Sequence, residues 1–143
     1  MSLEESKSLV RRFIDEVMNA GNTAAITELC VPDSMFATGI AGQVQSLKVA
    51  FPDHRFTVEE MLAEGDKVAV RMTVHGTNRG PLLGLPAFGR LEQPVPPTGK
   101  SMSSTGIAIY TIRNGRIASL DSELDQIALL RQLGWTFVPP SPG

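Results

Sequence analysis

The chain has 143 residues, of which 42% are hydrophobic and 20% are charged, and its formal net charge is −2. This length suits one domain that buries its core without disulfides. The charge gives no electrostatic basis for binding nucleic acid or an anionic membrane. The single cysteine, Cys30, excludes an internal disulfide and a cysteine-cluster metal site, and we expect it to be a buried small hydrophobe.

No apolar run approaches the ~20 residues that a membrane-spanning helix needs. The first residues, Met1 to Glu5, are acidic, which is unlike a signal peptide. We therefore expect a cytoplasmic protein.

The first fifty residues are predicted to be mainly helical. Ser2 and Glu5 match a capping box, and the apolar stripe that follows predicts a helix ending near Gly21. Asn22 or Thr23 can cap a second short helix through Leu29. We then expect a brief strand over residues 35–38 and a loosely helical segment over residues 41–51, closed by Pro52.

From Arg55 the spacing of the apolar residues changes from a helical period to that of strands. Residues 56–63 and 67–77 are predicted to form a hairpin around Glu64-Gly65-Asp66. In its second strand the alternation separates an apolar face from a polar one that contains Arg71, Thr73 and His75. Residues 79–100 are rich in glycine and proline but too apolar for a plain connector, so we interpret them as a partly ordered lid.

The last third contains a second predicted hairpin and a helix. Residues 104–112 and 117–124 read as strands joined at Asn114-Gly115, the strongest short hairpin signal. Residues 126–133 form an amphipathic helix, which Gly134 can cap. We expect one domain over residues 1–138 and a flexible tail over 139–143.

One strand end carries the chain's only cluster of carboxylates. Asp121 and Glu123, and by extension Asp125, alternate in phase and share one strand face. If that face lines a pocket, at least one pKa must rise, and the group could act as an acid or base. If it faces water, the row protects an edge strand, and Asp125 directly before residues 126–133 is a good helix N-cap. The sequence leaves both possibilities open.

Helices followed by antiparallel hairpins predict an α+β fold in which a curved sheet wraps around the N-terminal helices. Such a fold encloses a pocket between helix and sheet that suits small apolar molecules.

An ordered set of short segments adds a resemblance to a known family. These segments are Phe51-Pro52-Asp53, Ala63 to Val68, Arg71 to Gly80, Pro97 to Lys100, Asn114 to Ile117 and Asp125 to Gly134. Together they resemble the SnoaL-like polyketide cyclases, also called predicted ester cyclases, of the nuclear-transport-factor-two-like superfamily. The resemblance implies a cone-shaped α+β barrel with a deep pocket, and it also implies a homodimer.

The resemblance further implies an activity. Cyclases of this kind close a ring by an intramolecular aldol reaction without metal or cofactor, and their acid/base aspartate corresponds to Asp125. Many relatives have tryptophan at the position of Asp121, and residues 86–97 look like an insertion.

Our leading hypothesis is therefore a cofactor-free enzyme that acts on an apolar carbonyl compound, by aldol cyclisation or as an isomerase or lyase. Asp125 would be the general acid/base, assisted by Asp121 or His75. Candidate substrate contacts are Arg71, Glu123, Phe51, Met72 and Trp135. The two histidines share no short motif, so no metal site is expected. The alternatives are a non-catalytic domain that binds a hydrophobic ligand and a dimeric interaction module.

Overall fold

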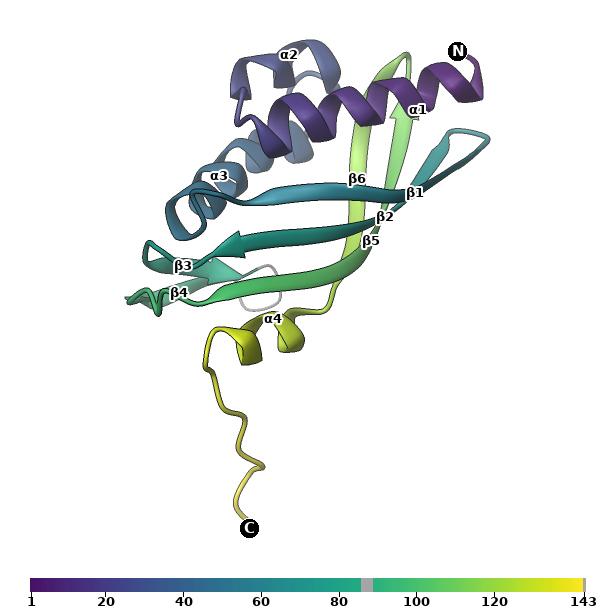
Figure 1. The fold of residues 1–143 in the computed structure, drawn as a ribbon. Helices are drawn as coiled ribbons and strands as arrows, with labels where there is room; N and C mark the ends of the chain where they lie inside the picture. Colours follow the sequence, from purple (N-terminus) through teal and green to yellow (C-terminus); the bar gives the residue numbers. More distant parts are fainter. Residues whose placement is uncertain (86–88, 143) are drawn as a thin grey trace.

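The computed structural model describes residues 1–85 and 89–142 and has an α+β arrangement. A curved antiparallel sheet carries the N-terminal helices on its concave face, while a short C-terminal helix lies at the other end of the molecule (Figure 1). The sheet does not close into a barrel. The predicted α+β class, with a curved sheet around N-terminal helices, is confirmed.

The helices begin where the sequence supplies caps. Their bounds are α1 Leu3–Arg12, η1 Phe13–Asn19 (π-helical), η2 Thr23–Ala25 (3-10), α2 Ile26–Leu29, α3 Met35–Ala50 and α4 Gln126–Gln132. The Ser2 hydroxyl accepts a hydrogen bond from the Glu5 amide at 3.1 Å, as the capping box predicts.

The strand predicted over residues 35–38 is wrong, because these residues form the first turn of α3. The Ser34 hydroxyl accepts a hydrogen bond from the Ala37 amide at 3.0 Å and so caps the helix. The Phe36 ring also packs on the Phe13 ring, with 5.6 Å between the centroids. A cap and a tertiary contact thus outweigh the weak strand preference of this segment.

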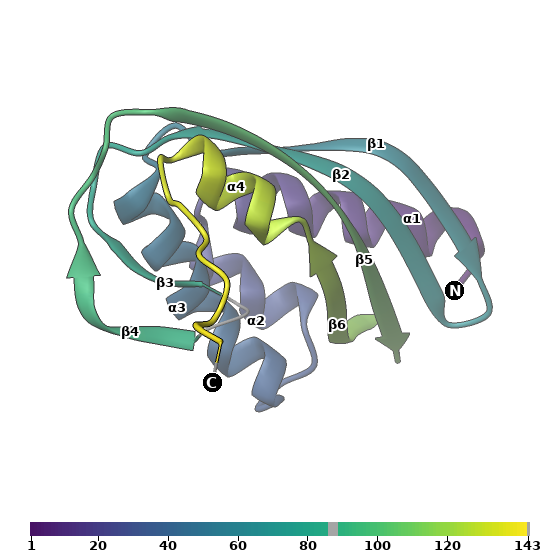
Figure 2. The same ribbon diagram turned by 90° about the horizontal axis from the view of Figure 1, so that it is seen from below.

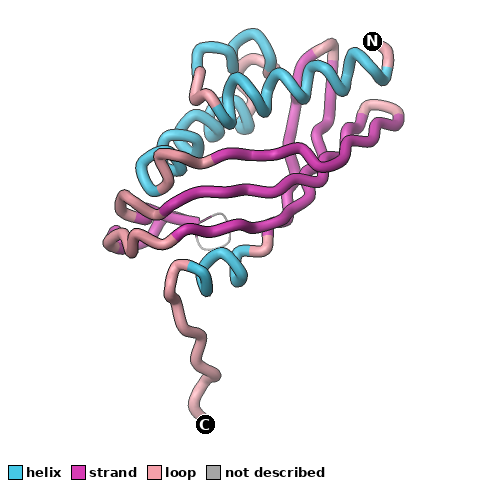
Figure 3. Tube along the Cα trace, viewed as in Figure 1, coloured by secondary structure: helices cyan, strands magenta, loops and turns pink. Residues whose placement is uncertain are grey.

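The main sheet has the order β1-β2-β5-β6, with every neighbouring pair antiparallel (Figure 3). The bounds are β1 Arg55–Glu64, β2 Lys67–Thr77, β5 Ser101–Arg113 and β6 Arg116–Leu124. At the β5–β6 turn both Asn114 and Gly115 have positive φ, 52° and 74°. This is the conformation that a tight two-residue hairpin requires, so the predicted turn is confirmed.

Residues 79–100 contain a second, two-stranded sheet that lies beside α3 (Figure 2). Its strands are β3 Leu82–Leu85 and β4 Gly89–Val95. The lid prediction covers residues 86–88, which lie outside the described residues, and it stays a prediction. The flexible tail over 139–143 also stays a prediction, and its last residue, Gly143, lies outside the described residues as well.

Alternating burial distinguishes the two faces of the sheet. The concave face packs against α1, η1 and α3 to form the core, which includes Val10, Phe13, Ile14, Val17, Val44, Val68, Val70, Met72, Val74, Ala108 and Tyr110. The convex face carries Arg71 and His75, which are exposed, as the alternation in β2 predicts. Two large apolar side chains, Ile107 and Ile109, are exposed on the same convex face.

One contact between the end of β2 and the turn after α3 predicts a pH dependence. The Asp53 carboxylate accepts hydrogen bonds from the Thr77 amide at 2.7 Å and from the Thr77 hydroxyl at 2.8 Å. These bonds, the amide first, lower the pKa of Asp53 below its usual value. A lowered folded-state pKa contributes stability above the unfolded-state pKa, and this contribution is lost as pH falls through the folded-state value.

We therefore expect Asp53→Asn to be less stable than the wild type at pH 7, and the difference to shrink as pH falls below about 4. The effect should be small, because the carboxylate is exposed to solvent. Urea unfolding of both proteins at pH 7 and pH 3 measures it. A difference in unfolding free energy that is equal at the two pH values would contradict the prediction.

Candidate functional site

Asp125 lies at the junction between β6 and α4, and its backbone is held on both sides. Its amide donates a hydrogen bond to the Thr105 carbonyl at 3.1 Å, and its carbonyl accepts one from the Ser104 hydroxyl at 2.8 Å. One carboxylate oxygen, Oδ1, accepts a hydrogen bond from the Ala128 amide at 3.0 Å and caps α4. The residue is exposed, and Oδ2 makes no hydrogen bond to any described residue. Asp125 is thus a fixed carboxylate with one oxygen free.

The helix that Asp125 begins is fastened to the edge of β5. The side-chain amide of Gln132 donates to the Ser103 carbonyl and accepts from the Ser103 amide, both at 2.8 Å. The Gln132 side chain therefore makes the two backbone hydrogen bonds to Ser103 that a neighbouring strand would make. It does so on the part of β5 that no longer pairs with β6. The helix ends at Gln132, and Gly134, which follows the C-cap Leu133, has a φ of 99° that suits glycine. Sequence reasoning missed Ser104 and Gln132 as positioning residues, although Gln132 belongs to the quoted motif before Gly134.

The other two carboxylates lie on the convex face, and both are exposed. Cross-strand pairing places Arg71 opposite Ile107 and Ile107 opposite Glu123, while Ile109 lies opposite Asp121. These five residues line an open hollow of about 570 Å³. The structure therefore brings three predicted site residues together, but on the face opposite the helices.

The remaining predicted site residues lie elsewhere. His75 is exposed on the convex face, opposite Ser103, and does not line the hollow. Phe51 and Met72 are buried in the core, and Trp135 is half-buried just after α4. The predicted assisting role of His75 and the predicted substrate contacts at Phe51, Met72 and Trp135 stay predictions.

Three further observations concern other kinds of site. Across residues 1–85 and 89–142, no three histidine, cysteine, aspartate or glutamate side chains are grouped so that they could hold a metal ion. Within the same residues, no helix has the length and hydropathy to cross a bilayer. Burial raises the pKa of the Cys30 thiol to about 11, so this thiol stays protonated and unreactive at neutral pH.

Comparison with solved structures finds the same fold in several bacterial proteins. TsrD from Streptomyces laurentii is 25% identical, with a TM-score of 0.79 over 94% of this chain and 98% of that one. AclR from Streptomyces galilaeus, described as a candidate hydroxylase, is 23% identical, with a TM-score of 0.76 over 98% of this chain and 87% of that one. IdmH from Streptomyces antibioticus, described as a candidate polyketide cyclase, is 24% identical, with a TM-score of 0.72 over 91% of this chain and 99% of that one.

A search of curated protein sequences gives no significant match. The family model of the SnoaL-like polyketide cyclases, however, matches residues 8–133, which is most of the chain. The structural neighbours agree with this match in fold. The chain belongs to the SnoaL-like polyketide cyclase family.

Proposed function

We propose that the protein is a cofactor-free enzyme that moves a proton at the carbon next to a carbonyl group of an apolar small molecule. The observation that carries this proposal is the geometry of Asp125. Its backbone is held at the end of β6, one carboxylate oxygen is occupied by the helix cap, and the other is free. A base held in this way has one oxygen available for a proton and loses little freedom when a substrate binds.

In the proposed reaction the free oxygen of Asp125 removes a proton from the carbon next to the carbonyl, leaving an enolate. In an aldol cyclisation the enolate carbon attacks a second carbonyl of the same molecule, and the protonated Asp125 returns its proton to the new alkoxide. In an isomerisation the proton returns to a different carbon instead. Asp121 is four strand residues away, about 13 Å along extended chain, so it cannot act on the same proton.

Asp125→Asn tests this assignment with little risk to the fold, since asparagine caps helices about as well as aspartate. We expect the wild type to accelerate deuterium exchange at the carbon next to the carbonyl of 1-indanone, followed by NMR in D2O. Asp125→Asn should lower the protein-dependent rate by about a hundredfold or more, the usual contribution of a general base. Its unfolding free energy should stay within about 0.5 kcal/mol of the wild type.

Asp66→Asn, in the distant β1–β2 turn, is the matched control and should exchange at the wild-type rate. If the wild type does not accelerate exchange, or if Asp125→Asn exchanges as fast as the wild type, Asp125 is not the base. Either result would favour the non-catalytic ligand-binding alternative.

We also propose that the protein forms a homodimer through the convex face of its sheet. Ile107 and Ile109 are 51% and 42% exposed there, which is unusual for large apolar side chains in adjoining positions. Arg71 lies on one side of Ile107 and Glu123 on the other, and Asp121 lies beside Ile109. A two-fold axis along β5, between two facing sheets, places each Arg71 over the partner's Glu123. Apolar residues at the centre with paired charges around them are typical of such interfaces.

Charge reversal tests this dimer. The wild type should have twice the 15.4 kDa chain mass in light scattering at micromolar concentration. Arg71→Glu should weaken the dimer at least tenfold, because it places like charges opposite each other, and Arg71→Glu combined with Glu123→Arg should restore it. Lys7→Glu, on α1, makes the same charge change away from this face and should have no effect. A monomeric wild type, or a double variant as weak as the single one, would contradict the proposal.

A further inference from the structure

Ser104 is a buried polar residue on the concave face of β5, among apolar neighbours. It is 4% exposed, lies opposite Val74 on β2, and shares its face with the buried Met102. Its hydroxyl donates a hydrogen bond to the Asp125 carbonyl at 2.8 Å, the only hydrogen bond that it makes to a described residue. Alanine would fill the same space without a polar group that needs a partner. The hydroxyl therefore serves the contact with Asp125 rather than the packing of the core.

The hydrogen bonds of Asp125 come from two elements. The Leu129 amide, at 3.2 Å from the Asp125 carbonyl, and the Ala128 amide, at 3.0 Å from Oδ1, belong to α4 and move with it. Thr105 and Ser104 belong to β5 and fix Asp125 relative to the sheet. Thr105 uses its backbone carbonyl, which any side chain leaves in place. Among the described residues, Ser104 is thus the one whose side chain ties Asp125 to the sheet.

The two bonds from β5 hold Asp125 on either side of its Cα. The bond to the Thr105 carbonyl fixes the preceding peptide group, and the bond from Ser104 fixes the following one. Between them Asp125 has φ −76° and ψ 80°, values of neither a regular helix nor a regular strand. Without the Ser104 bond the chain can turn about ψ, and α4 would carry the carboxylate with it through the Ala128 bond. Ser104 therefore sets the direction of the free oxygen Oδ2.

The strand residues before Asp125 leave little room for movement. A Cβ on Gly106 would lie 2.7 Å from the Glu123 carbonyl oxygen and would overlap the Leu124 side chain as well. The end of β6 therefore lies close against β5. Any motion of Asp125 has to come from the helix that follows it.

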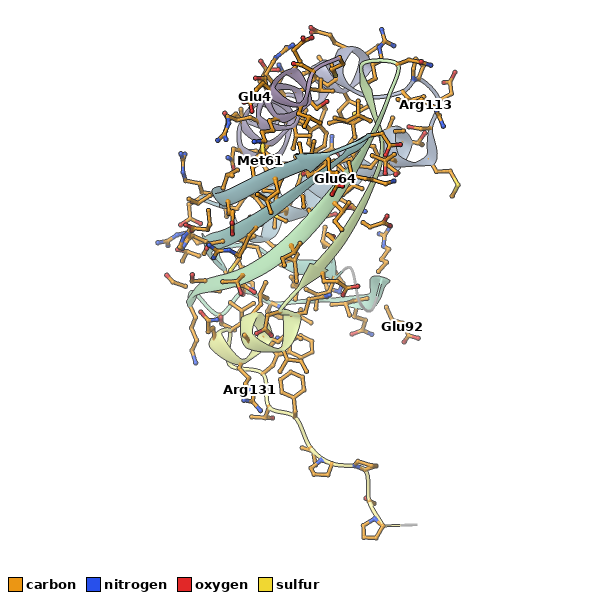
Figure 4. All side chains as sticks on the ribbon, turned by 90° about the vertical axis from the view of Figure 1, so that its right-hand side faces the viewer. Glu4, Met61, Glu64, Glu92, Arg113 and Arg131 are labelled. Atoms are coloured by element: carbon orange, nitrogen blue, oxygen red, sulfur yellow. The ribbon has the colours of Figure 1, made fainter. Side chains whose placement is uncertain are left out.

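The helix α4 depends on β5 for its position. It lies at the end of the molecule away from the β5–β6 turn, as Arg131 of α4 and Arg113 beside the turn show in Figure 4. Of the described elements, it packs chiefly against β5. Gln132 fastens its last turn to Ser103, and Ser104 fastens its start. Loss of the Ser104 contact therefore leaves the end that carries Asp125 free to shift.

We propose that Ser104 is a positioning residue for proton transfer, and that its hydroxyl holds the Asp125 peptide so that the free carboxylate oxygen stays aimed at the substrate. The inference rests on the proposed function, which makes Asp125 the base. Ser104 does not touch the substrate and acts through Asp125. A misplacement of about 1 Å can lower the rate of a catalysed step a hundredfold, so a base that turns on its backbone loses much of its effect.

Ser104→Ala removes the hydroxyl and keeps the packing. In the 1-indanone exchange assay we expect its kcat to fall about tenfold, while its KM stays within about twofold of the wild type because no substrate contact is lost. Added to Asp125→Asn, Ser104→Ala should cause no further loss, since a positioning residue has no effect once its base is absent. A merely structural role of Ser104 would lower the rate in both backgrounds.

Ser34→Ala is the matched control, because it removes a serine hydroxyl that caps α3 instead of holding Asp125. Both variants lose one hydrogen bond and should melt about 3 °C below the wild type. Ser34→Ala should nevertheless exchange indanone at the wild-type rate. Equal stability loss with unequal kcat would separate positioning from folding.

Three results would overturn the inference and leave the proposed function standing, provided that Asp125→Asn has lost its activity. These are a wild-type kcat in Ser104→Ala, a loss of rate that recurs in Ser34→Ala or in the Asp125→Asn background, and a raised KM with unchanged kcat, which would make Ser104 a binding contact. If the wild type does not accelerate exchange, or if Asp125→Asn exchanges as fast as the wild type, the proposed function fails and this inference fails with it.

Discussion

Replacing Gly80 with alanine is expected to lower the free energy of unfolding by about 3 kcal/mol or more, because a methyl group has no room there. A Cβ at this position would lie 1.9 Å from the Val49 carbonyl oxygen and 2.8 Å from its carbon. Both atoms belong to backbone in the last turn of α3, so neither can rotate away. The Gly80 amide also donates to the Ala50 carbonyl at 3.3 Å, and the substitution would strain this contact. Urea unfolding measures the loss.

Gly42→Ala is the matched control, since Gly42 lies inside α3 with no atom within 4 Å of a new Cβ. Alanine is a better helix former than glycine, so this variant should be more stable than the wild type by about 0.5–1 kcal/mol. The same substitution should therefore lower the free energy of unfolding at Gly80 and raise it at Gly42. A Gly80→Ala protein as stable as the wild type would show that the segment after β2 and the end of α3 do not approach each other as described.

Asn78→Ala is expected to cost about 2–3 kcal/mol and to lower the melting temperature by about 5–10 °C. Asn78 is 2% exposed and ties together three segments that are distant in sequence. Its side-chain amide donates to the carbonyls of Ala50 at 3.3 Å and Gly80 at 3.0 Å, and its oxygen accepts from the Thr98 amide at 2.9 Å. The variant loses these bonds and leaves a cavity where the amide was.

Asn22→Ala is the corresponding control, because Asn22 is exposed and its side chain makes no cap hydrogen bond. Its unfolding free energy should stay within about 0.5 kcal/mol of the wild type. An Asn78→Ala variant with the same melting temperature and unfolding free energy as Asn22→Ala would mean that water replaces the hydrogen bonds of Asn78 at no cost in stability. The connection between α3, the segment after β2 and the segment before β5 would then need another explanation.

The sequence predicted the elements whose signals are local. The capping box at Ser2, the alternation in β2 and the Asn114-Gly115 turn each depend on a few adjacent residues, and the structure confirms them. The first turn of α3 was missed because its cap at Ser34 competes with a segment of weak strand preference. Contact between Phe36 and Phe13 then decides the outcome, and this contact joins residues that the sequence pattern cannot pair.

The candidate site likewise has some features that the sequence predicted and others that depend on tertiary contacts. Alternation in β6 correctly grouped Asp121 with Glu123 on one face, but it could not tell whether that face lies inward or outward. That choice depends on the register with β5, where Ile107 and Ile109 are the exposed partners. Likewise, the position of Asp125 before α4 predicts a cap, whereas its anchoring depends on Ser104, which lies on another strand.

By itself, therefore, the sequence determined the α+β class, the hairpin turns, the helix caps at Ser2 and Asp125 and, through its short motifs, the family. These properties depend on interactions within a few residues or on motif order along the chain. Only the tertiary structure decided which face of β6 meets solvent and which residues anchor Asp125. Each of these depends on side chains that are far apart in sequence and meet only when the sheet curves around its helices.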